Sequence, residues 1–346
     1  MFQSATPIAF FQQQSTLLRS HLPGLLDGHV DSIHDARIAT RRIREVLPLT
    51  HDWQRRRDAD DFSARIREIG RSLGKARDAD VRIALLRYFE ARLPHAAASL
   101  VVVRQRQERD RLLLARKLVK RLEQLEVGQE LARLSRGASR RRRGFWVAMT
   151  GAWRPQLRRL LAERAQTAGA ALVHATGVYF PNRSHAARIA IKKFRYAMEI
   201  SAHARLLVDE PLLRALKKAQ DLLGEIHDRQ TLIDEMTDPA GKPDGIDAAQ
   251  IALVVRVAEV EIADLHARVL ARRSALLEAC RRTLGALDER VMVKGACAIA
   301  GAVALAAGIE ATRRHQRSRA RPGDAEPVAA AVSVRVPVML TEAPAR

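Results

Sequence analysis

The chain has 346 residues, 47% of them hydrophobic, which is enough for one large or two ordinary domains with a sizeable core. This composition excludes an intrinsically disordered chain. Sixty Lys and Arg against 39 Asp and Glu give a formal net charge of +21, which disfavours cationic partners and indicates a polyanion or an anionic membrane surface.

The N-terminal residues and the cysteines indicate the cellular compartment of the protein. Cys280 and Cys297 are the only cysteines, and a chain with its own large core gains little from one bridge. Residues 1–14 lack the basic head, continuous apolar run and cleavage site of a secretory signal. We therefore expect a reducing, cytoplasmic location and an N-terminus that belongs to the fold.

Apolar residues recur at helical spacing along most of the chain, and no segment alternates for long enough to form a strand. The sequence predicts an all-α fold. The expected helices cover about 5–20, 31–47, 57–73, 78–93, 96–134, 143–166, 184–207, 211–223, 228–236 and 245–287. Proline and glycine should end them at Pro23-Gly24, Pro48, Pro94, Pro181, Pro211 and 238–245.

The predicted helices form one domain over 1–290 with two halves, about 5–140 and 141–287. The basic segment SRGASRRRRG at 135–144 marks the joint. Beyond it, we expect an Ala/Gly-rich apolar tail helix at 291–310 and a disordered basic tail at 311–346.

One motif occurs twice at helical spacing. His34 to Arg44 reads HDARIATRRIR, and His185 to Arg195, 151 positions later, reads HAARIAIKKFR. On a helix each copy has a cationic side and an opposite apolar side. The cationic residues are His34, Arg37, Arg41 and Arg44, then His185, Arg188, Lys192 and Arg195. The apolar residues are Ala36, Ala39, Ile43, Val46 and Leu47, then Ala187, Ala190, Phe194, Ala197 and Met198.

A second match follows each copy at an offset of 150: LGKARDADV from Leu73 and LGEIHDRQT from Leu223. The paired matches indicate an internal duplication. We interpret the glycines of both segments as helix ends, and Asp78 and Asp228 as caps of the next helices, rather than as carboxylates that orient an arginine.

These motifs resemble the CHAD family, named for its conserved histidine and α-helical domain. The likeness rests on HDARIATRRIR, LGKARDADV, HAARIAIKKFR with the following YAMEI, and LGEIHD, and it spans about 5–287. The resemblance implies two pseudo-symmetric antiparallel helical bundles that enclose a basic central channel. It also implies binding of inorganic polyphosphate without catalysis.

The residues themselves fit that ligand, because polyphosphate offers regularly spaced charges and no bases to be read. Arginine binds phosphate oxygens in a bidentate manner, and the histidines predict an affinity that rises as the pH falls toward 6. Arg42 and Lys193 lie further round their helices, where solvent exposure is an equal alternative. The candidate polyphosphate-binding residues are His34, Arg37, Arg41, Arg42, Arg44, Arg67, Arg71, His185, Arg188, Lys192, Lys193, Arg195 and Lys217.

Other functions remain as alternatives. A nucleic-acid-binding protein fits the charge, and the arginines at 140–143 suit it, but aromatic residues for base stacking are scarce. An accessory subunit of a polyphosphate-processing enzyme is also compatible. We expect no catalytic activity, cofactor or metal site, since no phosphate-binding glycine loop, acidic cluster or metal-ligand spacing is present. The uncharged segment 295–309 is short for a membrane span and suits contact with protein, lipid or a storage granule.

Overall fold

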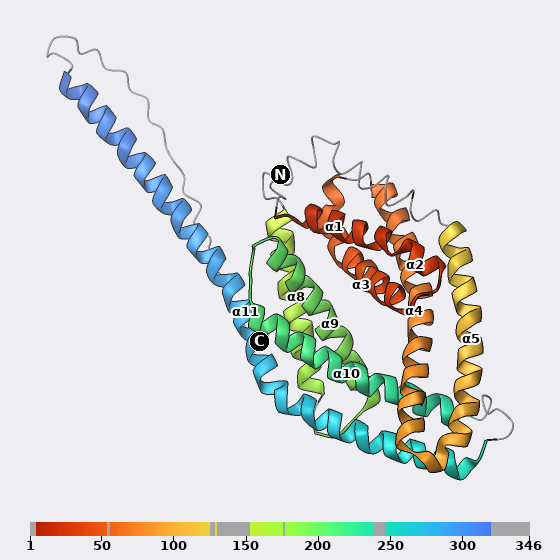
Figure 1. The fold of residues 1–346 in the computed structure, drawn as a ribbon. Coiled ribbons are helices and arrows are strands. Elements are labelled where there is room, and N and C mark those ends of the chain that lie inside the picture. The colour runs from red at the N-terminus through yellow and green to blue at the C-terminus, as the bar shows by residue number, and fades with distance from the viewer. Residues whose placement is uncertain are drawn as a thin grey trace, which may run out of the picture. The chain divides into compact units, whose positions relative to one another are not determined.

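The computed structural model describes residues 5–53, 56–124, 129, 153–175, 177–238 and 246–319. Every regular element in these ranges is a helix, so the all-α prediction is confirmed (Figure 1). The elements are α1 (Pro7–Ser20), α2 (Leu22–Leu26), α3 (Val30–Val46), the 3-10 helix η1 (Leu47–Trp53), α4 (Arg56–Arg92), the 3-10 helix η2 (Pro94–Ala96), α5 (Ala97–Gln124), α8 (Trp153–His174), α9 (Pro181–His203), α10 (Glu210–Thr237) and α11 (Ala248–Arg319).

Helix starts follow the local sequence. Pro7 and Pro181 each occupy the first turn of a helix, where a missing backbone donor is harmless. The Thr6 hydroxyl accepts a hydrogen bond from the backbone N–H of Ala9 at 3.2 Å, and Asp209 caps α10 in the same way. The predicted breaks at Pro48, Pro94, Pro181 and Pro211 therefore coincide with helix boundaries, whereas Pro23-Gly24 lies within α2.

Two other predicted breaks are wrong. The sequence predicted pairs of short helices separated at Gly74 and Gly224, but α4 and α10 continue through both glycines. An internal glycine costs only about 1 kcal/mol relative to alanine, and buried apolar residues flank each glycine and hold the helix in the core. Asp78 and Asp228 consequently lie within helices and do not act as caps.

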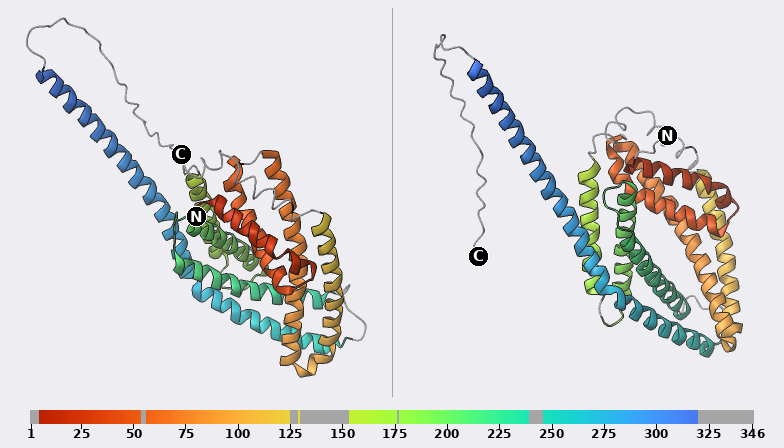
Figure 2. Two further views of the ribbon diagram at one scale, coloured as in Figure 1. Left: turned by 45° about the horizontal axis from the view of Figure 1, so that its top comes forward. Right: turned by 60° about the vertical axis from the view of Figure 1, so that its left-hand side comes forward.

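Neighbouring helices pack as antiparallel pairs. The long helices α4 and α5 lie side by side along most of their length (Figures 1 and 2), and α8, α9 and α10 pack in sequence order. Helix α3 contacts α1 and α4, and it also contacts α9, which brings the two motif copies together. The internal duplication and the central channel stay predictions.

The apolar sides predicted for both motif copies form the core. In α3, Ala36, Ile43 and Val46 have no exposed surface. In α9, the side chains of Phe194 and Met198 are equally inaccessible to water. Burial of this apolar surface is the main force that fixes the two helices, and it leaves their opposite sides free to carry charge.

Helix α11 includes both the helix predicted to end at 287 and the tail helix predicted at 291–310. It ends at Arg319, within the segment predicted to be disordered. Contacts divide the chain into one unit, Met1–Asp288, and a second, Glu289–Arg346. No described helix combines the length and hydropathy that a membrane span requires. The basic joint at 135–144 and residues 320–346 lie outside the described residues.

Candidate anion-binding site

The cationic sides of α3 and α9 meet. Lys192 of α9 experiences the charges of three α3 arginines, Arg41, Arg37 and Arg44, and also that of Arg188. Burial, followed by these like charges, lowers the pKa of Lys192 to about 7. We call Arg37, Arg41, Arg44, Arg188 and Lys192 the basic cluster. Such a concentration of cations in partly buried positions is unfavourable alone and attracts an anion.

Two carboxylates partly neutralise the basic cluster. Asp78 of α4 forms an ion pair with Arg37 at 3.0 Å between Oδ1 and Nη1. Asp228 of α10 interacts electrostatically with Arg188, and burial raises the pKa of Asp228. The pKa of Arg37 still falls to about 10, because burial and Arg41 outweigh Asp78. The cluster thus contains internal counter-ions but keeps an excess of positive charge.

Histidines border the basic cluster. Burial comes first among the causes that lower the pKa of His34 and of His185, and nearby cations lower both further. The ring of His227, on α10, lies 4.9 Å from that of His185 between centroids. Burial and Arg188 lower the pKa of His227 to about 4. All three imidazoles are therefore mainly neutral at pH 7 in the free protein.

Two of the predicted site residues, Arg42 and Arg195, form ion pairs with Glu199. Glu199 accepts a hydrogen bond from Nε of Arg42 at 2.8 Å and lies 3.2 Å from Nη1 of Arg195. All three side chains are largely buried, so this triad joins α3 to α9. Arg42 is thus held by an ion pair and is only partly exposed, so the fully solvated alternative is wrong. Lys193 is exposed, as its alternative interpretation held.

The remaining predicted residues, Arg67, Arg71 and Lys217, lie near other predicted cationic residues on two different helices. Arg67 and Arg71 of α4 both lower the pKa of Arg44, although burial lowers it most. Lys217 of α10 borders a cavity of about 510 Å³ between α1, α3, α9 and α10. His34, Arg41, Arg42 and Arg195 share this cavity with Lys217, which places five predicted residues around one space.

Sequence reasoning missed several members of this site. Arg77 and His227 occupy equivalent places in LGKARDADV and LGEIHDRQT. Both interact with residues of the stripes, by which we mean the cationic sides of the two motif copies. Asp78 and Asp228 were interpreted as caps. Their equivalent positions in the two repeated segments were the signal that could have identified them. Because each helix continues through its glycine, each Asp lies one turn after Gly74 or Gly224, on the same helix as a basic residue.

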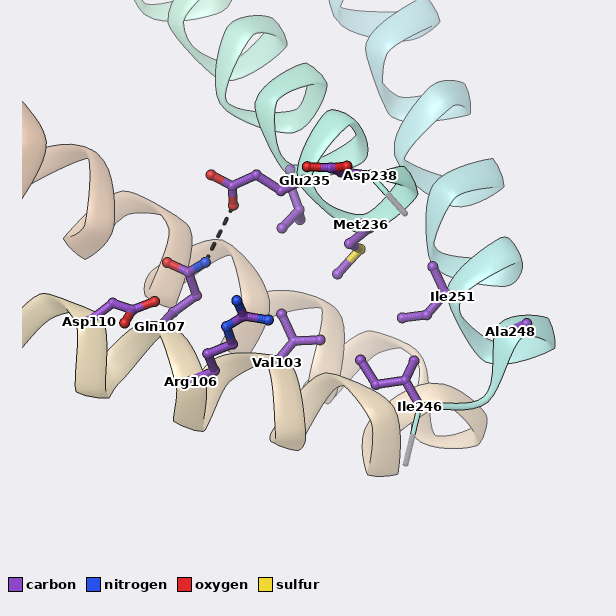
Figure 3. Close-up of a pocket in the computed structure, with 11 residues that line it drawn as sticks. Val103, Arg106, Gln107, Asp110, Glu235, Met236, Asp238, Ile246, Ala248 and Ile251 are labelled. Atoms are coloured by element: carbon purple, nitrogen blue, oxygen red, sulfur yellow. Dashed lines mark hydrogen bonds between the residues drawn. The ribbon is translucent and has the colours of Figure 1, made fainter. Parts of the chain in front are cut away.

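A second cavity, of about 210 Å³, lies away from the basic cluster, between α5, α10 and the start of α11 (Figure 3). Val103, Met236 and Ile251 give it apolar walls, and Gln107 donates a hydrogen bond to Glu235 at its edge. This mixed lining does not suit a polyanion. Among the described side chains, no three His, Cys, Asp or Glu residues gather as metal ligands would.

Comparison with known proteins agrees with the fold. The chain resembles the crystal structure of the CHAD domain from the plant Ricinus communis with a TM-score of 0.51 and 19% identity, over 82% of this chain and 91% of that one. PptA from Streptomyces chartreusis matches with a TM-score of 0.45 and 16% identity, over 83% and 99%. No curated protein matches significantly. The model of the CHAD domain family matches residues 9–237, and the chain therefore belongs to the CHAD domain family.

Proposed function

We propose that this protein binds inorganic polyphosphate, without catalysis, on the facing cationic sides of α3 and α9. The CHAD family is linked to polyphosphate binding and metabolism. The observation that carries the proposal is the position of Lys192, which lies among arginines of both helices. A linear polyanion between the two helices would contact both stripes at once.

The geometry suits a chain of phosphates. Arg41 and Arg44 form no ion pair with a carboxylate among the described residues, so their guanidinium groups are available as bidentate donors. They lie one turn apart, about 5 Å along the helix axis, and His34 to Arg44 spans about 15 Å. The stripe can therefore follow several consecutive phosphates, with the α9 residues on the other side.

Charge reversal tests the proposal. A variant with Arg37, Arg41, Arg188 and Lys192 replaced by glutamate should lose measurable binding of polyphosphate of defined length, as measured by calorimetry. The matched control replaces four exposed cations of α5, Arg109, Arg116, Lys117 and Lys120, by glutamate and so changes the net charge equally. The control should keep most of the affinity. Equal losses in both variants would show that only the overall charge matters.

The alternatives of nucleic-acid binding and of catalysis can be tested with the same protein preparation. Competition of labelled polyphosphate against DNA and RNA at fixed salt should favour polyphosphate, since Tyr196, the aromatic residue beside Arg188, is buried and offers no platform for base stacking. Incubation of the protein with Mg²⁺ and radiolabelled polyphosphate should release no phosphate. Release or transfer of label would replace the binding proposal by an enzymatic one.

A further inference from the structure

The cavity of about 510 Å³ between α1, α3, α9 and α10 has a lining that a chain of phosphates alone does not explain. His34, Arg41 and Lys217 border it, but so do the carboxylates of Asp35 and Asp221. Like charges repel, so carboxylates in the lining disfavour an occupant that consists only of phosphates. The cavity therefore suits a molecule that carries phosphate and also hydrogen-bond donors.

Two glutamines of the cavity have side-chain oxygens without a partner. Gln14 of α1 is only 3% exposed, and its Oε1 accepts no hydrogen bond from the described residues. The buried Oε1 of Gln220, on α10, likewise has no partner among them. Buried polar atoms are nearly always hydrogen-bonded in folded proteins, so two such oxygens around one cavity indicate an occupant. Half a turn of the amide exchanges its oxygen and nitrogen, so each glutamine offers a donor and an acceptor.

Apolar side chains complete the lining. Leu17 of α1 and Ile38 of α3 border the cavity, and both keep part of their surface exposed. Such surfaces suit the face of a flat ring. Pockets that hold a small molecule have volumes of about 300–1,000 Å³, combine apolar walls with a few polar groups, and bury most of their ligand. The cavity has the size and the mixed lining of such a pocket.

We propose that this cavity binds a nucleoside polyphosphate. Arg41 and Lys217 bind the phosphates, because guanidinium and ammonium groups are the usual donors to phosphate oxygens. The amides of Gln14 and Gln220 bind the edge of the base, as a glutamine amide does when it pairs with the amino group and ring nitrogen of adenine. Asp221 accepts a hydrogen bond from a ribose hydroxyl, which is the role of a carboxylate in dinucleotide sites.

This inference goes beyond the proposed function and uses a different part of the surface. Long polyphosphate needs the cationic sides of α3 and α9 and neither glutamine. The two ligands share His34, Arg41 and Lys217, so each should compete with the other. The nucleoside, in contrast, is recognised only by groups that polyphosphate does not use.

The contribution of the nucleoside is measured by comparing ATP with tripolyphosphate. Both contain a chain of three phosphates, and overall charge gives ATP no advantage. In calorimetry with the full-length protein, without Mg²⁺, we expect ATP to bind at least about tenfold more tightly, because the base and ribose add hydrogen bonds and apolar contact. Equal affinities, or tighter binding of tripolyphosphate, would overturn the proposal.

Replacing Gln14 by leucine tests the recognition of the base. Gln14→Leu should bring the affinity for ATP to within about threefold of that for tripolyphosphate, which itself should not change. The matched control is Gln13→Leu, an exposed neighbour on α1 that does not border the cavity, and it should keep the preference for ATP. A preserved preference in Gln14→Leu, or an equal loss in both variants, would contradict the role of this amide.

Stability is followed for the same variants. Leucine in place of a buried amide without a partner should not lower the free energy of unfolding in urea denaturation, since an apolar group of similar size needs no hydrogen bond. If Gln14→Leu does not fold, Gln220→Leu makes the same test from α10. A preference for ATP that survives in a folded Gln220→Leu protein would then count against the proposal.

Long polyphosphate separates this inference from the proposed function. Gln14→Leu should bind long polyphosphate as tightly as the unmodified protein does. A preference for ATP over tripolyphosphate, in a protein without affinity for long polyphosphate, would support the nucleotide site and contradict the proposed function. Tight binding of long polyphosphate without that preference would contradict the nucleotide site and support the proposed function.

Discussion

Side chains in the basic cluster and at its border hold fewer protons than their residue types suggest. Burial and like charges lower the pKa of Lys192 to about 7 and also lower those of His34 and His185. A bound polyanion reverses the electrostatic part of these shifts, because it stabilises the charged forms. Binding should therefore be coupled to the uptake of protons.

The affinity for polyphosphate should consequently depend on pH. Above pH 7 the free protein has lost the Lys192 proton that the complex retains, so affinity falls as the pH rises, by at most about tenfold per unit for one proton. Between pH 7 and 6, protonation of His34 and His185 should raise it further. Calorimetry from pH 6 to 9 measures this, and the variant Lys192→Arg should be flat between 7 and 9. The same slope in that variant would exclude Lys192 as its source.

Asp78 pairs with Arg37, one of the residues that we propose bind polyphosphate. Replacing Asp78 by asparagine frees this guanidinium and removes a negative charge, so affinity for polyphosphate should increase by about two- to tenfold, the range expected for a half-exposed ion pair. Asp264→Asn on α11 is the control, since it also removes an exposed, arginine-paired carboxylate. Titration with labelled polyphosphate compares them. An affinity at or below that of the unmodified protein would show that Asp78 instead orients Arg37 for binding.

At the scale of elements, the contact between α3 and α9 depends on Glu199 as well as on apolar packing. This carboxylate pairs with Arg42 across the helix contact and with Arg195 on its own helix. Two arginines that the sequence assigned to the ligand are therefore structural, and the triad holds the two stripes in register.

Replacing Glu199 by glutamine should lower the free energy of unfolding by about 2–4 kcal/mol, because it leaves two largely buried guanidinium groups without a counter-ion. Urea denaturation measures the change. Glu123→Gln, an exposed position at the end of α5, should change stability by less than about 0.5 kcal/mol. A similarly small effect for Glu199 would mean that apolar packing alone fixes the contact.

For the whole molecule, the formal charge of +21 opposes the compact state, and like charges act on one another where α3 and α9 meet. A polyanion that binds only the folded state should stabilise it by mass action, by about 2.7 kcal/mol when its concentration is 100 times the dissociation constant. The melting temperature should therefore rise with polyphosphate and less so at high salt. The charge-reversal variant should show no rise, and the α5 control should keep it.

The sequence predicted the two sides of the motif helices and the helix ends with different success. The apolar side of each was predicted correctly, residue by residue, because burial follows helical periodicity. The cationic residues were identified because the second copy repeats the first in register, and their role in binding stays a prediction. The breaks at Gly74 and Gly224 were predicted wrongly, because local propensity is weaker than the packing that carries α4 and α10 through the core.

The sequence by itself determined that the chain is helical, that α3 and α9 are each half apolar and half cationic, and that these halves recur. These properties depend on spacing along one helix. Only the tertiary structure decided that Glu199 pairs with Arg42 and Arg195, and that His227 and Asp228 interact with Arg188. It also decided that Lys192 interacts with arginines of another helix. Electrostatic interactions act through space between residues distant in the chain, and their strength depends on burial, which periodicity does not specify.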